Sequence, residues 1–355
     1  MNLYCTRPGC LQPLNSFTDL DDLATLKTVS QKYCSCCGMP LILLGRYLPL
    51  KLLGRGGFGT AFLARDRYTP GLRQCVVKQF QPAVNLTPEQ FETAKELFER
   101  EGEALETLGN AHPWIPDLFA FFELTVSGLP PTPEETFFYL VQEFIDGQTM
   151  EEEVAQKGLL TSDEVLDMLA QVLPILTFIH ERGAIHQDIK PSNIMRHRNG
   201  QFYLLDFGSA QQVTTRNTGA KASGIYSLGF APPEQVAGNP VYPASDLYAL
   251  AVTCIVMLTG RLPNQLFDAV DKIWQWQIYA DQVDPLLADV LNQMLALPIQ
   301  QRFQSATAVL QALQPEHSKH VFPTIKPVAH RIGVNLHIPP TAPPSLSTPT
   351  ELQLP

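Results

Sequence analysis

The sequence predicts an α+β fold with a small sheet-rich lobe and a larger helical lobe, preceded by a small cysteine-rich module. Three observations support this prediction. Of the seven cysteines, five lie in the first 37 residues. Apolar, β-prone runs dominate the chain up to about residue 145, and helical patterns dominate it beyond about residue 147. The 355 residues, 45% of them hydrophobic, suffice to bury the core of one large domain with accessory segments.

Local patterns place the elements of the two lobes. Strand-like runs are predicted over residues 47–53, 74–80 and 137–144, and the second of them is expected to end the first hairpin. Residues 128–133 include prolines and are expected to form a loop. The predicted helices span residues 88–108, with Thr87 as the N-cap, residues 161–181 and residues 245–258.

Composition divides the chain into three predicted parts. Residues 1–40 form the cysteine-rich module. Residues 41–314 form the main domain, with a small lobe over residues 41–145 and a large lobe over residues 146–314. Residues 315–355 have the composition of a linker or tail, because nine of these 41 residues are proline.

The charge balance excludes several classes of partner. A formal net charge of −10 repels nucleic acid and anionic membranes, so no nucleic-acid partner is expected. The chain has no apolar run of about 18 residues, so we expect no transmembrane segment. The first 16 residues lack the pattern of a signal peptide, and the expected location is therefore cytoplasmic. The oligomeric state is left open by the sequence.

A glycine-rich segment follows the first predicted strand. It reads Gly54-Arg55-Gly56-Gly57-Phe58-Gly59, and such glycines let the backbone approach phosphates and donate N–H groups to them. Dinucleotide-binding folds use the same G-x-G-x-x-G spacing, but there a helix follows the glycines. Here another strand follows. This favours a glycine-rich hairpin that covers the phosphates of ATP.

Two charged residues extend this interpretation. Lys78 ends an apolar strand, from which its ammonium group can reach the α- and β-phosphates of a nucleotide. Such a lysine needs an anionic partner, and Glu101 lies on the helix that follows. A lysine and a glutamate also pair often by chance on protein surfaces, so these two residues alone leave both interpretations open.

The decisive segment reads His186-Gln187-Asp188-Ile189-Lys190-Pro191-Ser192-Asn193. Asp188 is placed to accept the proton of a substrate hydroxyl, and Asn193 to coordinate Mg²⁺. Thirteen residues later comes Asp206-Phe207-Gly208, whose aspartate can hold Mg²⁺ bridging the β- and γ-phosphates. A positioned base, metal ligands and phosphate clamps are what phosphoryl transfer needs. The joint spacing argues against ordinary loop carboxylates.

With these motifs the chain resembles the eukaryotic-like (Hanks-type) protein kinases over residues 47–314. The resemblance implies the bilobal protein-kinase fold, with ATP in the cleft. It assigns Gly54, Gly56 and Gly59 to the phosphate loop, Lys78 and Glu101 to an ion pair, and Asp188 to the catalytic base. Asn193 and Asp206 become ligands of Mg²⁺ or Mn²⁺. Ala61, Val76, Gln142 and the backbone of Glu143 and Ile145 are assigned to the adenine site.

Further landmarks indicate the substrate class. Lys190 and Ser227 match the serine/threonine branch, in which the hydroxyl bridges base and lysine. Glu234 resembles the residue that ends the activation segment and pairs with Arg302, and Asp246 resembles the buried anchor of the catalytic loop. Small-molecule kinases usually lack these last three features, so protein substrates are expected, with protein regulators as further partners.

One departure from the family concerns regulation. Gln187 stands where an arginine usually precedes the base and pairs with an activation-loop phosphate. We expect autophosphorylation of the hydroxyl residues in that loop, but with little effect on activity; these residues are Thr214, Thr215, Thr218 and Ser223. A second departure concerns the adenine slot, where Ala61 replaces the usual valine and Val76 replaces the usual alanine. The side-chain volume lost at one position is gained at the other, so we expect the slot to keep its volume.

The N-terminal cysteines form two close pairs, Cys5-x4-Cys10 and Cys34-x2-Cys37. Four thiolates in two pairs suit a tetrahedral structural Zn²⁺, as in a zinc ribbon, and clustered cysteines in a reducing compartment favour metal over disulfides. Cys36 is the alternative to Cys37 as a ligand. The module is similar to the four-cysteine leader of many cyanobacterial serine/threonine kinases, although its spacer of 23 residues is long. Free thiols or a redox-active cluster are the competing interpretations.

The sequence therefore predicts an ATP-dependent protein kinase that phosphorylates serine or threonine, with Mg²⁺ and a structural Zn²⁺. A pseudokinase is disfavoured because the lysine, the base and both metal ligands are present. A nucleic-acid reader is disfavoured by the acidic balance and the lack of a basic cluster near the cysteines.

Overall fold

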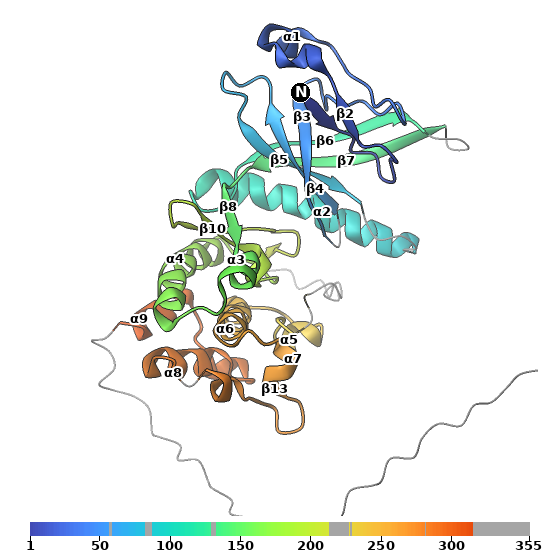
Figure 1. Ribbon diagram of the computed structural model, residues 1–355. Helices are drawn as coiled ribbons and strands as arrows, with labels where there is room; N and C mark the ends of the chain where they lie inside the picture. The colour runs from blue at the N-terminus through green and yellow to red at the C-terminus, as the bar shows by residue number, and fades with distance from the viewer. Residues whose placement is uncertain are drawn as a thin grey trace, which may run out of the picture. The chain divides into compact units, whose positions relative to one another are not determined.

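A five-stranded antiparallel sheet forms the centre of the small lobe (Figure 1). In the computed structural model the strand order is β3-β4-β5-β7-β6. The strands are β3 (Tyr47–Arg55), β4 (Gly59–Asp66), β5 (Gln74–Phe80), β7 (Glu134–Glu143) and β6 (Leu118–Ser127). The β5 strand is paired on both edges, with β4 and with β7, so its register is fixed from two sides.

The structure describes residues 1–56, 59–81, 87–128, 133–212, 227, 229–280 and 282–314. Several predictions concern residues outside these ranges, namely Gly57 and Phe58, most of the loop over residues 128–133, the four activation-loop hydroxyl residues and the tail over residues 315–355. They stay predictions, as does the division of the chain at residues 40, 145 and 314.

The two faces of the sheet bury different partners. Successive side chains of a strand point to opposite faces, and directly opposite residues of neighbouring antiparallel strands share a face. Lys78 is opposite both Ala61 and Leu140, on the face toward the helix that follows β5. Gln79 is opposite Tyr139, on the face toward the N-terminal module.

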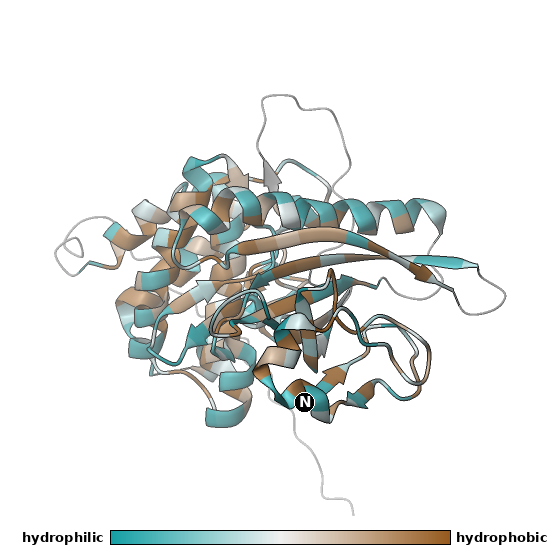
Figure 2. Cartoon of the chain, turned by 90° about the horizontal axis from the view of Figure 1, so that it is seen from above, coloured by the Kyte–Doolittle hydropathy of each residue, from teal (hydrophilic) through white to brown (hydrophobic). Residues whose placement is uncertain are grey.

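The helix α2 (Pro88–Leu108) covers the first face of the sheet. It begins with a capping box, in which Thr87 and Gln90 satisfy each other's backbone N–H groups, and with a proline in the first turn. Its buried side includes Leu97, Phe98 and Leu105, whereas much of its surface is hydrophilic (Figure 2). The helix therefore places Glu101 against the sheet by the ordinary packing of an amphipathic helix.

The N-terminal module packs on the second face. It contains β1 (Asn2–Tyr4), β2 (Leu14–Ser16) and α1 (Leu23–Thr28), and Figure 1 shows β1 and β2 beside β3. Apolar side chains of the module and of the sheet form one continuous buried cluster. Its fully or nearly fully buried members include Leu3, Leu20, Leu26, Met39, Tyr47, Phe62, Val77, Tyr139 and Val141.

The large lobe is built from helices around a second apolar cluster. Its helices are α3 (Met150–Lys157), α4 (Ser162–Glu181), α5 (Pro233–Val236), α6 (Pro243–Thr259), α7 (Pro263–Leu266), α8 (Pro285–Met294) and α9 (Ala306–Ala312). Almost every side chain of α6 is buried, as its continuous apolar sequence predicts. None of the helices in the described part of the chain combines the length and apolarity needed to cross a bilayer.

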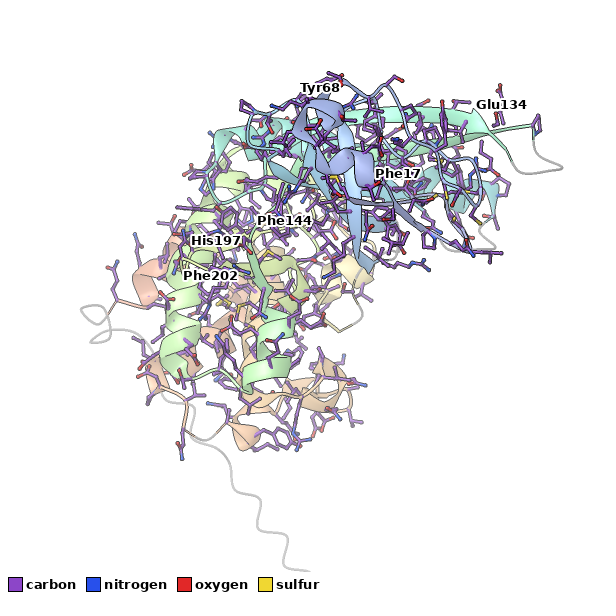
Figure 3. The ribbon with its side chains drawn as sticks, turned by 45° about the horizontal axis from the view of Figure 1, so that its top comes forward. Phe17, Tyr68, Glu134, Phe144, His197 and Phe202 are labelled. Carbon is purple, nitrogen blue, oxygen red and sulfur yellow. The ribbon has the colours of Figure 1, made fainter. Side chains whose placement is uncertain are left out.

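Short strands of the large lobe lie next to the small lobe. A three-stranded sheet consists of β8 (Gly147–Thr149), β10 (Ile194–His197) and β11 (Phe202–Leu204), and β9 (Ala184–Ile185) pairs with β12 (Gln211–Gln212). Figure 3 labels Phe144, just after β7, together with His197 of β10 and Phe202 of β11.

A separate hairpin of the large lobe joins β13 (Phe267–Asp268) to β14 (Ile273–Trp274).

The main elements agree with the predictions from sequence. The predicted helices correspond to α2, α4 and α6, and Thr87 is the N-cap of α2. One topological expectation was wrong, because the hairpin partner of β3 is β4 rather than residues 74–80. The β4 strand forms because the chain reverses at the glycines, and Gly59 in particular must lack a side chain, since a Cβ there would overlap the carbonyl of Gln79.

Candidate active site

Asp188 is the centre of a closed hydrogen-bonded triangle in the large lobe. Lys190 Nζ donates to Asp188 Oδ2 at 2.7 Å and to Ser227 Oγ at 2.7 Å. Ser227 Oγ in turn donates to Asp188 Oδ1 at 2.7 Å. Burial alone would raise the pKa of Asp188, but the charge of Lys190 and the hydrogen bonds outweigh burial and lower it. The carboxylate is therefore ionised at neutral pH and can accept a proton.

Asn193 is held beside the same carboxylate. Its Nδ2 donates to the backbone carbonyl of Asp188 at 2.8 Å and to Asp188 Oδ2 at 3.1 Å. Because the amide nitrogen is engaged in this way, the amide oxygen is the group that remains as a potential metal ligand. The structure thus brings Asp188, Lys190, Asn193 and Ser227 together, as the sequence predicts.

Asp246 anchors the loop that contains Asp188. Its buried carboxylate accepts the backbone N–H groups of His186 and Gln187, both at 2.9 Å, and Nε2 of His180 at 2.8 Å. Burial by itself would raise the pKa of Asp246, but the interactions with His180 and the backbone outweigh it and lower the pKa. A charged, fully hydrogen-bonded anchor on α6 therefore fixes the start of the loop.

His186 connects this loop to the segment that contains Asp206. Its Nδ1 accepts the N–H of Asp188 at 3.3 Å, so Nε2 has the hydrogen that is donated to the Leu205 carbonyl at 3.0 Å. Its ring also lies edge-on to Phe207. Gln187 and Asp206 each have a positive φ, 66° and 63°. Such conformations are costly for residues other than glycine and concentrate at functional sites.

Lys78 and Glu101 form the predicted ion pair between β5 and α2. Burial alone would lower the pKa of Lys78, but the charges of Glu101 and Asp206 outweigh burial and raise it. Lys78 therefore stays charged at neutral pH. Asp206 lies near this pair, because Asp206 Oδ1 and Glu101 Cβ are both within 4 Å of the position that a Cβ of Gly208 would occupy. The structure therefore gathers a cation and two acidic side chains from three separate segments.

The predicted adenine-site residues share the Lys78 face of the sheet. Ala61 is directly opposite Lys78, and Val76 is directly opposite Gln142 two residues along the same strands. Gln142 is buried, and in the described residues its Oε1 has no hydrogen-bond partner. The segment after it begins with Glu143, whose N–H donates to the Asp117 carbonyl at 2.9 Å, and includes the buried Ile145.

The glycine-rich segment connects β3 to β4. Gly54 and Arg55 end β3, and the N–H of Gly56 donates to the carbonyl of Gly59 at 2.8 Å. Gly57 and Phe58 lie outside the described residues. The segment therefore turns beside the β4–β5 pair that positions Ala61 and Lys78.

Glu234 and Arg302 form the second predicted ion pair. The guanidinium donates two hydrogen bonds to the carboxylate, at 2.8 Å and 3.0 Å. It also donates to the carbonyls of Ala296 at 2.6 Å and Leu297 at 3.0 Å. Each of its three nitrogens therefore donates at least one hydrogen bond. This pair ties the segment after Ser227 to the end of the large lobe.

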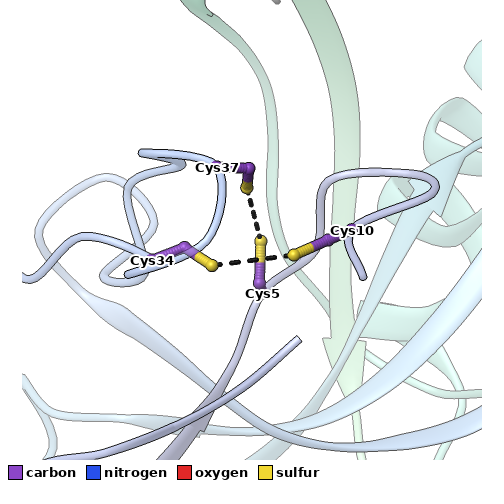
Figure 4. Close-up of side chains that lie close together, drawn as sticks. All are labelled: Cys5, Cys10, Cys34 and Cys37. Carbon is purple, nitrogen blue, oxygen red and sulfur yellow. Dashed lines mark hydrogen bonds between the residues drawn. The ribbon is translucent and has the colours of Figure 1, made fainter. Parts of the chain in front are cut away.

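Four cysteine sulfurs from the N-terminal module gather at one point (Figure 4). The Sγ atoms of Cys5, Cys10, Cys34 and Cys37 lie within 4.8 Å of one another. Two of the separations are 3.5 Å, from Cys5 to Cys37, and 3.7 Å, from Cys10 to Cys34. Tetrahedral zinc with bonds of about 2.3 Å requires sulfurs about 3.8 Å apart, so the cluster fits the ion. Cys36 is exposed and does not belong to the cluster.

Backbone turns and a polar neighbour shape this cluster. Gly9 and Gly38, beside Cys10 and Cys37, both have φ of 72°, which glycine adopts without strain. Asn15 Nδ2 donates to Cys34 Sγ at 3.5 Å. Burial would raise the pKa of Cys34, but the N–H groups of Cys37 and Cys36 and the Asn15 amide lower it to about 6.

Several positioning residues were not predicted from sequence. His180, at the end of α4, and Gln235, whose Nε2 donates to the Gln187 carbonyl at 2.9 Å, both support the loop of Asp188. Thr6 and Tyr139 form a buried hydrogen bond between the module and the sheet. Only Tyr139 and His180 have a sequence signal, namely a polar group in or at the end of an apolar run.

This fold and the arrangement of these side chains are those of the protein kinase class. Consistently, residues 47–321 match the family described as protein kinase domain. The chain therefore belongs to the protein kinase family.

Curated relatives identify the branch of this family. Serine/threonine-protein kinase F of Synechocystis sp. is 52% identical over 359 residues, which cover 100% of this chain and 72% of that protein. Serine/threonine-protein kinase B of the same organism is 39% identical, covering 88% of this chain and 51% of the relative. Serine/threonine-protein kinase PknA of Nostoc sp. is 38% identical, covering 78% and 48%. The chain belongs to the bacterial, Hanks-type serine/threonine branch, and it spans about half the length of two of these three relatives.

Proposed function

We propose that this chain transfers the γ-phosphoryl group of ATP to serine or threonine hydroxyls of protein substrates, with Asp188 as the catalytic base. The observation that supports this role most strongly is the triangle of Asp188, Lys190 and Ser227. Ser227 and Lys190 leave the carboxylate ionised and oriented, so that it can accept the proton of an incoming hydroxyl. Lys190 then offers its charge to the phosphoryl group that this hydroxyl attacks.

The nucleotide is assigned to the Lys78 face of the sheet. Lys78, held by Glu101, offers a charge to the α- and β-phosphates, and Gly54, Gly56 and Gly59 let the backbone approach them. Ala61, Val76 and Gln142 line the base. The Glu143 N–H is engaged by Asp117 and the Ile145 carbonyl by Gly147, so the Glu143 carbonyl and the Ile145 N–H are the backbone groups assigned to the base.

The divalent cation is assigned to Asn193 and Asp206. Oxygen donors of an amide and a carboxylate suit Mg²⁺ or Mn²⁺, and the segment of Asp206 lies against α2 beside Glu101, the partner of Lys78. A cation held there neutralises charge on the β- and γ-phosphates. The chain holds both ligand side chains in place. Asn193 is held by its hydrogen bonds to Asp188, and Asp206 by its backbone conformation with a positive φ.

For the cysteine cluster we propose a structural zinc site with Cys5, Cys10, Cys34 and Cys37 as ligands. The sulfur separations support this role, and so does the hydrogen bond from Asn15, since such neighbours orient metal ligands. Thiolate ligands need reduced cysteines, which agrees with the cytoplasmic location expected from the sequence.

The proposed catalysis is tested with purified full-length chain, ATP, Mg²⁺ and a serine/threonine peptide library. Asp188→Asn and Asp206→Ala are each expected to lower kcat by about 10³-fold or more, because base and metal ligand act in the transition state. Asp289→Asn, at an exposed position of α8, is the matched control and should keep full turnover. Near-normal turnover of either active-site variant would refute that residue's role.

The proposed zinc site is tested by elemental analysis of protein purified under reducing conditions without chelator. One zinc per chain is expected, with loss of most metal in Cys37→Ser. Cys36→Ser is the matched control, because Cys36 is exposed and outside the cluster. A metal content near zero in the wild-type chain, or equal metal in both variants, would contradict the assignment.

A further inference from the structure

The hydroxyl of Tyr139 lies at the boundary between the N-terminal module and the sheet. Tyr139 is fully buried in the apolar cluster that the two parts share, where an unpaired hydroxyl would be destabilising. It has two partners. Thr6 Oγ1 of the module lies 2.8 Å away, and Nε2 of Gln79 on β5 lies 3.0 Å away.

The chemistry of the three groups sets the direction of this chain of hydrogen bonds. The Gln79 amide nitrogen can only donate, so the Tyr139 oxygen accepts from it. The Tyr139 hydrogen then has Thr6 Oγ1 as its acceptor. Burial raises the pKa of Tyr139, which keeps the phenol protonated and the chain intact. Each link depends on the next, as expected for a buried polar network.

One end of the chain is directly attached to the proposed phosphate clamp. Gln79 follows Lys78 on β5 and points to the opposite face, and Tyr139 is its direct partner on β7. Because adjacent side chains of a strand are fixed in opposite directions, holding Gln79 on the module face also orients Lys78 toward Glu101 and α2.

The other end is attached to the cysteine cluster. Thr6 lies between Cys5, one of the four clustered thiols, and Arg7. Arg7 is buried and donates to the carbonyls of Ser127 at 2.6 Å and Cys37 at 3.2 Å. Three consecutive residues thus reach the metal site, Tyr139 and the end of the β6–β7 hairpin.

We infer that Thr6 and Tyr139 are positioning residues, which transmit the metal-held conformation of residues 5–7 through Gln79 to Lys78. The inference rests on the proposed roles of Cys5 as a zinc ligand and Lys78 as the phosphate clamp. It makes ATP affinity depend on the cysteine cluster, although no atom of that cluster touches the nucleotide face.

The test uses zinc-loaded full-length chain with Thr6→Val or Tyr139→Phe. Each variant removes one hydroxyl and keeps the rest of the side chain. We expect Kd and KM for ATP to rise three- to tenfold, with kcat within twofold of wild type and one zinc per chain retained. The double variant should show the same rise as each single variant, because both break one chain of hydrogen bonds.

Two controls separate positioning from general damage to the core. Tyr47→Phe removes another buried tyrosine hydroxyl of the same cluster, one that has no partner among the described residues. Thr6→Ser retains the hydroxyl. Both should keep wild-type Kd for ATP. Tyr139→Phe with an ATP affinity equal to that of Tyr47→Phe would overturn the inference.

Zinc removal provides the decisive comparison. Chelation should weaken ATP binding by wild-type chain several-fold, and by a clearly smaller factor in Tyr139→Phe. An equal factor in the two proteins would overturn the inference. Failure of the proposed function is distinguishable, because it would appear as a wild-type chain without zinc or without phosphoryl transfer.

Discussion

The two lobes hold their active-site residues in different ways. In the large lobe, Asp188 is fixed by Lys190, Asn193 and Ser227, and its loop by two backbone hydrogen bonds to Asp246. In the small lobe, the ion pair of Lys78 among the described residues is with Glu101, which lies on another element. The loop of Asp188 is therefore locked within its own lobe, whereas the clamp depends on how β5 and α2 are placed relative to each other.

This difference indicates where control can act. A network of short, buried bonds has one arrangement of low free energy, and losing one member costs stability. An ion pair between a strand and a helix can be opened by a small shift of either element, with little loss of packing. We therefore expect substitutions in the large-lobe network to change the free energy of unfolding, and substitutions at the small-lobe ion pair to change the affinity for ATP.

The largest effect is expected at Asp246. Asp246→Ala removes a buried acceptor of two backbone N–H groups and one imidazole, and should lower the free energy of unfolding by about 3–5 kcal/mol. Denaturant titration measures this loss. Asp289→Ala, an exposed aspartate of α8, should change stability by less than about 0.5 kcal/mol. Equal stabilities of the two variants would show that the anchor is dispensable.

A smaller loss is expected at the buried ion pair of Arg302. Arg302→Lys keeps the charge but cannot reproduce the paired hydrogen bonds to Glu234 and the bonds to two carbonyls. The free energy of unfolding should fall by about 2–3 kcal/mol, from hydrogen bonds to a charged group. Arg100→Lys on the exposed side of α2 is the control, because its ion pair with Glu96, at 3.5 Å, is exposed to solvent and can be kept by lysine. Unchanged unfolding of the Arg302 variant would contradict the prediction.

In the small lobe the expected change is in affinity instead. Lys78→Ala should raise Kd for ATP about tenfold, or about 1.4 kcal/mol, while Glu101→Gln gives a smaller rise by releasing Lys78. Isothermal titration measures both constants, and thermal unfolding should show little change. The control Lys51→Ala removes an exposed lysine of β3. A wild-type Kd in both clamp variants would mean that other groups hold the phosphates.

The smallest effect concerns acid stability. The pKa of Asp246 is lower in the folded chain than its ordinary value, so its ionised form stabilises the fold above about pH 4. That contribution is lost as the pH falls through the folded-state pKa. As the pH falls below about 4, the free energy of unfolding of wild type should therefore fall more steeply than that of Asp246→Asn. Parallel pH profiles would assign the acid sensitivity to other carboxylates.

Much of the kinase site could be predicted from sequence because short motifs encode local geometry. The Asp188, Lys190 and Asn193 spacing fixes one loop, and the capping of α2 at Thr87 sets the rotation that presents Glu101. For the ion pairs Lys78–Glu101 and Glu234–Arg302, the family resemblance had already named both partners. Likewise, four of the five N-terminal cysteines were expected to converge.

What could not be predicted depends on contacts between distant segments. Thr6 and Tyr139 are 133 residues apart, and nothing local distinguishes their hydroxyls from others in apolar runs. By contrast, the Cys34-x2-Cys37 spacing had already favoured Cys37 over Cys36, and the cluster contains Cys37. The β4 strand was overlooked as the partner of β3 because it immediately follows the glycines.

The apolar cluster shared by the module and the sheet has a consequence for the order of synthesis. The ribosome completes the last cluster cysteine, Cys37, about 100 residues before the sheet residues Tyr139 and Val141, a delay of roughly 5–20 s at ordinary rates of translation. Throughout that interval the cysteines are made, but the sheet face against which they are buried is incomplete. The thiols of the nascent chain are therefore open to water, and accessible to metal ions or oxidants, for that time.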